Sequence, residues 1–478
     1  MEDTRTNNVA PTDASRPFAS TSNDAVTPSE KVEGAGVQAC ETLKGLLDKD
    51  LGFHGADGRF ATHAWHPFPA KFPPQLPAFF IEALTEEGDV VFDPMHGSGT
   101  TLVEAQRLAR YPVGCDIDPL ARLITSAKLW PLAGLEAMEV GRGIAESAAQ
   151  RFQEDKDGLV GALERRFDPK SRDFVDYWFA RETQLELLAL LQEIEALADP
   201  TARRFFEVVF SSTIIAKSGG VSLARDLAHT RPHRAKDKRP KSAFTEFDKR
   251  LRNNLVDRSD VRRCDHELRG APAQATGLDD SSVDLVVTSP PYANNAIDYM
   301  RAHKFSLVWL GWPIADLTDI RKGYLGHDAK GGVVPNAGGI KTNTDGDGLD
   351  QHFRWEGELP ARCIDTLNAL RAIDARKADV LQRYFMDMAA VFQEMVRVLR
   401  RGKAAIVVVG SSVLRGIDVE THKALAAIGE AVGFVLVGIG TRELDRDKRM
   451  MPARWGKTRT SRIEERMHQE FVIGLVKP

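Results

Sequence analysis

The apolar positions of the chain follow two patterns: short continuous runs, and longer stretches in which apolar residues recur every three or four positions. The first pattern dominates residues 78–129, where an apolar helix is expected at 78–84, strands at 89–93 and 112–117, and helices at 100–109 and from Pro119 onward. Short buried runs that alternate with helices are typical of parallel strands joined by crossover helices. This order predicts an α/β fold with a doubly wound sheet.

The pattern changes between residues 130 and 258, where the spacing becomes helical. Leu185, Leu188, Leu191 and Ile194 recur at the interval that places side chains on one helix face. Strands are expected again at 260–264, 283–288, 404–409, 434–439 and 470–476, with a long helix at 375–399. The sequence therefore predicts one α/β domain, 37–129 and 259–478, interrupted by a helical insertion at 130–258.

Two segments lack a core pattern. Residues 1–36 are rich in Ser, Thr, Asn, Asp, Ala and Pro, so a disordered N-terminal tail is expected. Residues 323–348 are rich in Gly and Asn and predict a long loop, either a cover for a substrate or a plain surface connection.

Composition narrows the class of protein only a little. No apolar run reaches the roughly 18 residues of a membrane span, and the N-terminus lacks the order of a secretory signal, so a cytoplasmic protein is expected. The four cysteines are scattered singly, which favours buried thiols over disulfides or a zinc site.

The net charge of −4 hides an uneven distribution. Residues 217–263 carry 14 Lys and Arg against 6 Asp and Glu, and residues 442–466 carry 9 against 5. A basic stretch can contact phosphates even on an acidic chain, although a solvated helix face gives the same pattern.

A glycine turn after the strand at 89–93 is the first candidate binding site. Gly97 and Gly99 lack side chains where a ligand would approach the start of a helix, and Asp93 closes the strand before them. Asp116 ends the next strand, where a carboxylate can accept hydrogen bonds from ribose hydroxyls. The turn does not follow the GxGxxG spacing, and the acid before it favours an amino-acid ligand over a pyrophosphate. A structural turn or another nucleotide remains open at this point.

A proline-held segment after the strand at 283–288 is the candidate catalytic loop. It consists of Ser289, Pro290, Pro291 and Tyr292. The prolines stop the strand and stiffen the loop at the sheet edge where doubly wound folds bind ligands. The Ser289 hydroxyl and the Pro290 carbonyl can accept hydrogens from an amino group on a base, and Tyr292 can stack on an extruded base. The chain contains no Pro-Cys dipeptide, so no thiolate nucleophile of that kind is indicated.

Together these two segments resemble the DNA amino-methyltransferases, the N4-cytosine and N6-adenine enzymes. The family's DPFxGSGTT motif is matched from Asp93 to Thr101 with Met95 in place of Phe, and its (Asp/Asn/Ser)-Pro-Pro-(Tyr/Phe) motif is matched from Ser289 to Tyr292. The similar segments are 65–128, 260–312 and 380–478, and the cofactor motif precedes the catalytic loop, which excludes the permuted arrangement.

The resemblance implies a Rossmann-like class I methyltransferase fold with a mostly parallel sheet of seven strands, and S-adenosyl-L-methionine as the cofactor, with no metal. It also implies DNA as a partner, with the target base flipped out of the duplex, and a restriction endonuclease as a possible companion. The implied cofactor-binding residues are Lys71, Phe72, Pro73, Asp93, Met95, Gly97, Ser98, Gly99, Thr100, Thr101, Asp116, Ile117 and Asp265.

The sequence leaves several alternatives for the target base and for the class of substrate. Ser289 at the first motif position looks more like the cytosine N4 enzymes, while adenine N6 is the alternative. An enzyme acting on guanine N2 of RNA or tRNA and an inactive nucleic-acid-binding protein are the rival classes. Asp298, Tyr299 and His303 follow the loop and either shape the base pocket or pack as ordinary helix residues.

The basic stretch of the insertion is the candidate target-recognition region. His229 and His233 are four residues apart, but Pro232 lies between them and no third ligand is near, so a metal site is not expected. The candidate DNA-binding residues are Arg225, Arg231, Arg234, Lys236, Lys238 and Arg239.

Overall fold

The computed structural model describes most of the chain. The described residues are 28–69, 71–130, 134–216, 220–225, 227, 232–235, 237–255, 264–293, 298–325, 355–444 and 468–478. Expectations for residues 1–27, for most of the loop at 323–348 and for most of the basic segment at 442–466 therefore lie outside this part.

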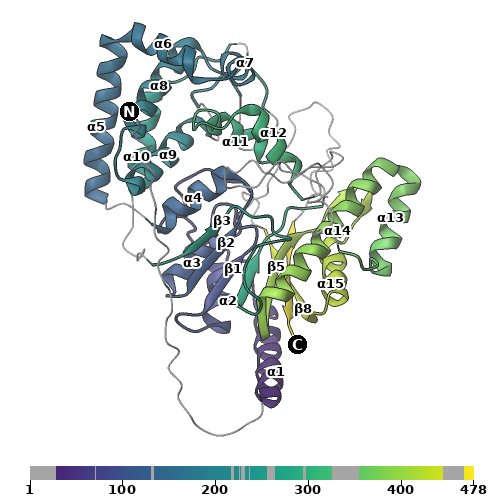
Figure 1. Ribbon diagram of the computed structural model, residues 1–478. Helices are drawn as coiled ribbons and strands as arrows, with labels where there is room; N and C mark the ends of the chain where they lie inside the picture. Colours follow the sequence, from purple (N-terminus) through teal and green to yellow (C-terminus); the bar gives the residue numbers. More distant parts are fainter. Residues whose placement is uncertain are drawn as a thin grey trace, which may run out of the picture.

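A seven-stranded sheet forms the centre of the fold, in the order β3-β2-β1-β4-β5-β9-β8 (Figure 1). The strands are β1 (Val90–Asp93), β2 (Tyr111–Cys115), β3 (Glu267–Arg269), β4 (Val283–Thr288), β5 (Leu399–Gly410), β8 (Val435–Glu443) and β9 (Gln469–Val476). The five strands β3, β2, β1, β4 and β5 pair with one another in parallel. Strand β9 is antiparallel to its two neighbours, β5 and β8. The predicted fold class, a doubly wound and mostly parallel α/β sheet, is confirmed.

Helices cover both faces of this sheet. They are α1 (Pro28–Leu47), α2 (Gln75–Leu84), α3 (Thr100–Arg107), α4 (Pro119–Leu129), α13 (Ala361–Ile373), α14 (Ala375–Val398) and α15 (Thr421–Ala431). Consecutive residues of β4 enter different cores: Leu285 and Val287 pack with α1 and α2, while Val286 packs with α14. Because side chains alternate along a strand, a strand covered on both faces must be apolar throughout, and this explains the unbroken apolar run.

Helix α1 packs on the antiparallel edge of the sheet through glycines. A Cβ on Gly474 would lie 2.7 Å from the Leu47 side chain, and one on Gly440 would lie 2.8 Å from that of Leu51. The missing side chains let the helix approach the strands closely, and Leu43 and Leu47 are buried there. The helix already begins at Pro28, inside the range that the sequence assigned to a disordered tail.

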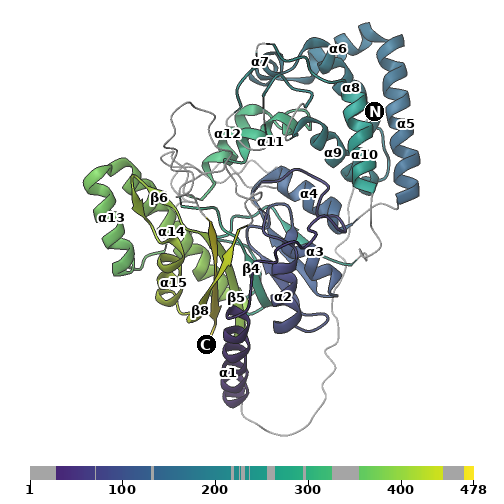
Figure 2. The same cartoon turned by 180° about the vertical axis from the view of Figure 1, so that it is seen from behind.

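A separate helical group stands above one end of the sheet (Figures 1 and 2). Its helices are α5 (Gly134–Glu154), α6 (Lys156–Arg166), α7 (Pro169–Trp178), α8 (Arg181–Glu195), α9 (Pro200–Ile214), α10 (Ala243–Leu255), α11 (Met300–Leu307) and α12 (Ile314–Lys322). The last two come from the segment after β4, yet Phe305 and Trp309 lie in the same core as Phe179. The group is thus built from two stretches of chain, whereas the predicted insertion at 130–258 included only the first.

The remaining differences are local. Strand β3 begins at Glu267, after the range 260–264 in which a strand was expected. A two-stranded hairpin, β6 (Val413–Leu414) and β7 (Ile417–Asp418), follows β5. In the part of the chain that the structure describes, no helix is long and apolar enough to cross a bilayer.

Candidate active site

The turn between β1 and α3 is built on two glycines in left-handed conformations, with φ values of 51° at Gly97 and 77° at Gly99. A Cβ on Gly99 would lie 2.6 Å from Thr125 of α4, and one on Gly97 would lie 3.2 Å from the Phe68 ring. Other residues would be strained and crowded at both positions. The turn therefore holds the N-terminus of α3 at the carboxyl edge of the sheet, the position at which helix termini bind anionic groups.

Asp93 ends β1 as a buried carboxylate that links the two predicted motifs. Its Oδ1 accepts hydrogen bonds from Thr288 Oγ1 at 2.7 Å and from the Met95 amide at 3.1 Å. Thr288 directly precedes Ser289, so the glycine turn and the proline-held segment lie on neighbouring strands. Burial raises the pKa of Asp93 to about 6.

Asp116 follows β2 and faces the same turn. Its Oδ2 accepts a hydrogen bond from the Gly97 amide at 2.9 Å, and its Oδ1 accepts one from the Asp118 amide at 2.8 Å. Burial, with the neighbouring charge of Asp118, raises the pKa of Asp116 to about 7. Each carboxylate oxygen has a second lone pair, so hydroxyl donors of a ligand would stabilise the ionised form.

Two buried side chains, those of Lys128 and His96, contact the backbone carbonyls of the turn. Lys128 is fully buried and donates a hydrogen bond to the Ser98 carbonyl at 2.7 Å, and burial lowers its pKa well below the usual value. His96 Nδ1 lies 3.0 Å from the Gly97 carbonyl oxygen, and burial lowers its pKa to about 4. The imidazole is therefore neutral at pH 7. Neither residue was expected in this role, because sequence spacing does not indicate which side chains pack beneath a turn.

An aromatic cluster lies over the turn. The rings of Phe68 and Tyr299 stack with centroids 5.0 Å apart, and His303 lies 5.2 Å from Phe68. His303 Nδ1 is 2.5 Å from Asp118 Oδ2, which also accepts a hydrogen bond from the Tyr324 hydroxyl at 2.7 Å. These bonds outweigh the effect of burial and lower the pKa of Asp118. The cluster therefore connects α11, the helix after the proline-held segment, to the start of α4.

The three residues after β4 that were considered for a base pocket are all engaged by other side chains of the fold. Asp298 accepts hydrogen bonds from Arg321 Nε at 2.8 Å, and Arg301 Nε lies 2.9 Å from its Oδ2. Together with the contacts of Tyr299 and His303, this supports the interpretation as helix packing.

The proline-held segment lies at the carboxyl end of β4. Pro290 is buried, while Ser289, Pro291 and Tyr292 are half-buried. The Tyr292 hydroxyl donates a hydrogen bond to Glu470 Oε1 at 2.6 Å, and Glu470 belongs to β9, far away in the sequence. Sequence reasoning did not find Glu470, because it lies outside both motifs.

Most of the predicted cofactor residues gather around the turn. Met95, Ser98, Thr100, Thr101 and Ile117 lie in it or directly beside it, and Thr101 Oγ1 donates a hydrogen bond to the Val287 carbonyl at 3.1 Å. Lys71, Phe72 and Pro73 precede α2, and Lys71 Nζ donates a hydrogen bond to the His63 carbonyl at 2.8 Å.

Asp265 is an exception. It precedes β3, and the parallel register pairs Val113 with Glu267 and Cys115 with Arg269. Asp265 therefore lies near the amino end of this strand, away from the turn. The strand begins later than its apolar pattern indicated, and the expected role of Asp265 beside an adenine stays a prediction.

The described DNA-binding candidates lie on or beside a short antiparallel hairpin. Ala224 pairs with Arg234, and the Arg225 amide donates a hydrogen bond to the His233 carbonyl at 2.9 Å. The Arg234 guanidinium lies over the exposed ring of Tyr177, 4.9 Å from its centroid. Arg225 and Arg239 are exposed, whereas Lys238 Nζ donates a hydrogen bond to the Ala224 carbonyl at 2.6 Å and so stabilises the hairpin. Arg231, Lys236 and His229 lie outside the described residues.

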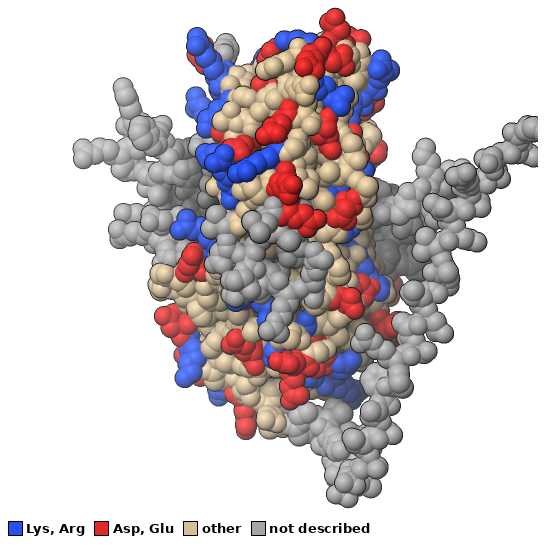
Figure 3. Space-filling model, turned by 90° about the vertical axis from the view of Figure 1, so that its left-hand side faces the viewer, with Lys and Arg blue, Asp and Glu red and all other residues tan. Residues whose placement is uncertain are grey.

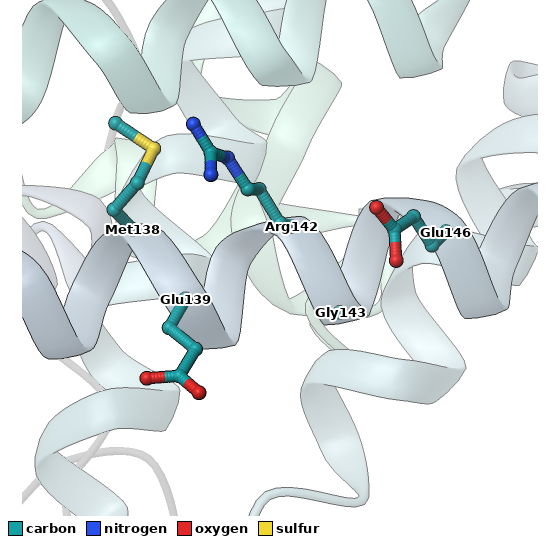
Figure 4. A pocket seen from close by; sticks show the side chains of 5 residues that line it. All are labelled: Met138, Glu139, Arg142, Gly143 and Glu146. Carbon is teal, nitrogen blue, oxygen red and sulfur yellow. The ribbon is translucent and has the colours of Figure 1, made fainter.

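The surface around α5 does not resemble a binding site. The face seen from the side of α5 mixes basic and acidic side chains (Figure 3). A hollow on α5 is lined by Met138, Glu139, Arg142, Gly143 and Glu146, all from this one helix, and the Glu139 side chain points away from Met138 and Arg142 (Figure 4). Among the described residues, no group of three or more His, Cys, Asp or Glu side chains could hold a metal ion.

Comparison with known proteins agrees with this geometry. Residues 37–125, which include the second half of α1, the strands β1 and β2 and the glycine turn but not the proline-held segment, match the N6/N4 family of DNA methylases. This part of the chain is therefore similar to the N6/N4 DNA methylases.

Proteins similar to this chain include two type II methyltransferases. M.MvaI from Kocuria varians is 27% identical over 57% of this chain and 62% of its own length, and M.BsoBI from Geobacillus stearothermophilus is 23% identical over 58% of each. The chain thus spans less than two thirds of the length of these relatives. The solved rRNA methyltransferase aviRa from Streptomyces viridochromogenes is 12% identical over 90% of this chain and 91% of its own, with a TM-score of 0.24, too low to support any argument.

The residues of the turn fit the cofactor that the N6/N4 DNA methylase family implies. Ser98 Oγ is a buried hydroxyl without a hydrogen-bond partner among the described atoms, and it lies between the two glycines. Asp93 and Asp116 offer carboxylates to an amino group and to ribose hydroxyls. This set of groups suits a ligand that combines an amino acid with a nucleoside.

Proposed function

We propose that this protein transfers a methyl group from S-adenosyl-L-methionine to an exocyclic amino group of a base in DNA, with cytosine N4 as the target. One observation carries the proposal: the segment from Ser289 to Tyr292 ends the strand next to the glycine turn, and Thr288 binds Asp93 at 2.7 Å. The groups that would hold a cofactor and those that would hold an amino group thus share one edge of the sheet. Carboxyl ends at a reversal of strand order are where doubly wound sheets bind ligands.

The chain's residues would act mainly by positioning. S-adenosyl-L-methionine supplies an electrophilic methyl group when bound, and Asp93, Asp116 and the glycine turn would hold it. Ser289 Oγ and the Pro290 carbonyl would accept hydrogen bonds from the amino group, which weakens the conjugation of its lone pair with the ring. The amino nitrogen would receive the methyl group while Ser289 Oγ and the Pro290 carbonyl hold its hydrogens, and one N–H proton would leave to solvent.

The preference for cytosine rests on Ser289. A serine at this position resembles the cytosine N4 enzymes, and adenine N6 is the alternative within the same chemistry. Both targets present a conjugated NH2 group, so the acceptors would act in the same way on either base.

Labelled cofactor tests this function directly. Purified protein incubated with S-adenosyl-L-methionine carrying a labelled methyl group should label duplex DNA and not tRNA. Digestion of the DNA to nucleosides should then yield N4-methylcytosine. N6-methyladenine without N4-methylcytosine would refute the choice of cytosine, and transfer to tRNA alone would refute DNA as the substrate.

The hairpin around Ala224 and Arg234 is the proposed DNA contact. Changing Arg225 and Arg239 together to glutamine should weaken DNA binding, because exposed guanidiniums neutralise phosphates and release counterions. The slope of log K against log salt should fall in magnitude by about 0.9 for each phosphate contact that is lost.

A matched control carries the same change of charge elsewhere. Arg142 of α5 and Arg165 of α6 are exposed on the outer helices, and changing both to glutamine should leave the slope unchanged. Equal effects of the two double variants, measured by fluorescence anisotropy at several salt concentrations, would show that the hairpin has no special part in DNA binding.

A further inference from the structure

Glu470 reaches the candidate active site because β9 runs antiparallel to its neighbours. It pairs in register with Gly410 at the end of β5 and with Arg442 near the end of β8. The beginning of an antiparallel strand lies beside the carboxyl ends of the strands around it. Glu470 therefore lies at the same edge of the sheet as the proline-held segment, although 178 residues separate it from Tyr292.

Both oxygens of the Glu470 carboxylate are engaged. Oε1 accepts the hydrogen bond from the Tyr292 hydroxyl at 2.6 Å, and Oε2 accepts one from Arg442 Nη1 at 2.8 Å. The Arg442 side chain is only 4% exposed and that of Glu470 is 13% exposed. A nearly buried ion pair thus accepts a hydrogen bond from one tyrosine hydroxyl. Burial, with the charge of Glu470, raises the pKa of this hydroxyl well above its usual value. The hydroxyl stays protonated and remains a donor at neutral pH.

This arrangement is costly if it only serves the stability of the fold. Buried ion pairs gain little or nothing over apolar side chains of similar volume, because both ions lose their hydration. The Tyr292 ring already packs against the core beneath α14 and α15, so an apolar neighbour would suffice for packing. The ion pair adds a fixed position: one carboxylate oxygen holds the Tyr292 hydroxyl and, with it, the direction in which the side chain extends from the backbone.

We infer that Glu470, itself fixed by Arg442, is a positioning residue that sets the orientation of Tyr292 so that its ring can stack on the target base. The inference rests on the proposed function, in which Tyr292 receives an extruded base. Glu470 does not touch the substrate in this scheme and acts only through the tyrosine hydroxyl. The sheet edge formed by β5, β9 and β8 thereby becomes part of the active site.

The test compares Glu470→Ala, Tyr292→Phe and the double variant in the full-length protein. Loss of the hydrogen bond to the carboxylate should lower kcat for methyl transfer to DNA by about tenfold or more, with KM for S-adenosyl-L-methionine unchanged. The double variant should lose no more than either single variant, because both remove the same contact. Glu470→Gln should recover part of the rate, since an amide can still hydrogen-bond to both neighbours.

Glu443→Gln serves as the matched control. Glu443 is exposed on β8 and accepts a hydrogen bond from Gln469 at 2.5 Å. Its replacement removes one negative charge next to Arg442, as Glu470→Gln does, but leaves the contacts of Tyr292 intact. Its kcat should equal that of the wild type.

The outcomes separate this inference from the proposed function. If the wild type and Glu443→Gln transfer methyl groups and Tyr292→Phe does so equally fast, the positioning role is refuted while the function stands. Independent, multiplicative losses in Glu470→Ala and Tyr292→Phe would refute it as well. If Glu470→Ala fails to fold, Tyr292→Phe decides alone, because it keeps the ring and removes only the hydroxyl. Absence of transfer by the wild type would refute the proposed function itself.

Discussion

Replacing Ser289 with alanine should lower the rate constant for methyl transfer by about 100-fold, the range seen when one preorganised hydrogen-bonding group is removed from an active site. Alanine keeps the backbone of the segment and removes only the hydroxyl that would accept a hydrogen from the amino group. Because Asp93 and the glycine turn are untouched, the Kd for S-adenosyl-L-methionine should stay the same. Single-turnover kinetics with labelled cofactor and calorimetric titration measure the two quantities separately.

Ser289→Asn is the control for this prediction. The asparagine side chain also presents an oxygen acceptor, so this variant should keep most of the rate that alanine loses. If alanine and asparagine reduced the rate to the same extent, the acceptor role of position 289 would be contradicted. A rate for Ser289→Ala equal to that of the wild type would also contradict it.

Replacing Asp116 with asparagine should weaken the binding of S-adenosyl-L-methionine by about 10- to 100-fold, as expected when hydrogen bonds to a charged group are lost. The wild type should also show a characteristic pH dependence. The pKa of Asp116 is raised to about 7, so the carboxyl group takes up a proton as the pH falls below that value and accepts hydrogen bonds less well. The Kd should therefore rise by up to about tenfold for each pH unit below 7.

The asparagine variant should lose this pH dependence between pH 7 and 6, apart from the contribution of Asp93, whose pKa is raised to about 6. Glu87→Gln is the control: Glu87 is exposed in the loop before β1, and this variant should bind the cofactor like the wild type at every pH. A wild-type Kd that stays constant from pH 8 to 5.5 in calorimetric titrations would rule out ionised Asp116 as a ligand.

The centre of the fold could be predicted because its signals are local. The strand ending at Asp93, the left-handed glycines and the apolar run before Ser289 each require particular residues within a few positions, and the structure has these elements at nearly the predicted bounds. Neighbouring parallel strands then bring both motifs to one edge without further information from the sequence.

Contacts between distant segments could not be predicted in this way. Trp309 joins the helical group through Phe167 and Phe179, with ring centroids 5.2 and 5.6 Å apart, although β3 and β4 separate it from them in the chain. Glu470 is another example, because only the reversed direction of β9 explains its position next to Tyr292. Periodicity indicates which face of an element is buried, but it does not indicate which other element covers that face.

The glycines beneath α1 bear on where the folding unit begins. The segments that resemble the known family start near residue 65. Leu43, Leu47 and Leu51 lie before them and fill a depression on β8 and β9, where Gly440 and Gly474 have no side chains. A chain truncated to begin at residue 65 would expose this apolar surface to solvent. The exposed surface would lie on β8 and β9, the strands that contain Arg442 and Glu470. Helix α1 is therefore an integral part of the α/β fold and not an appendage to it.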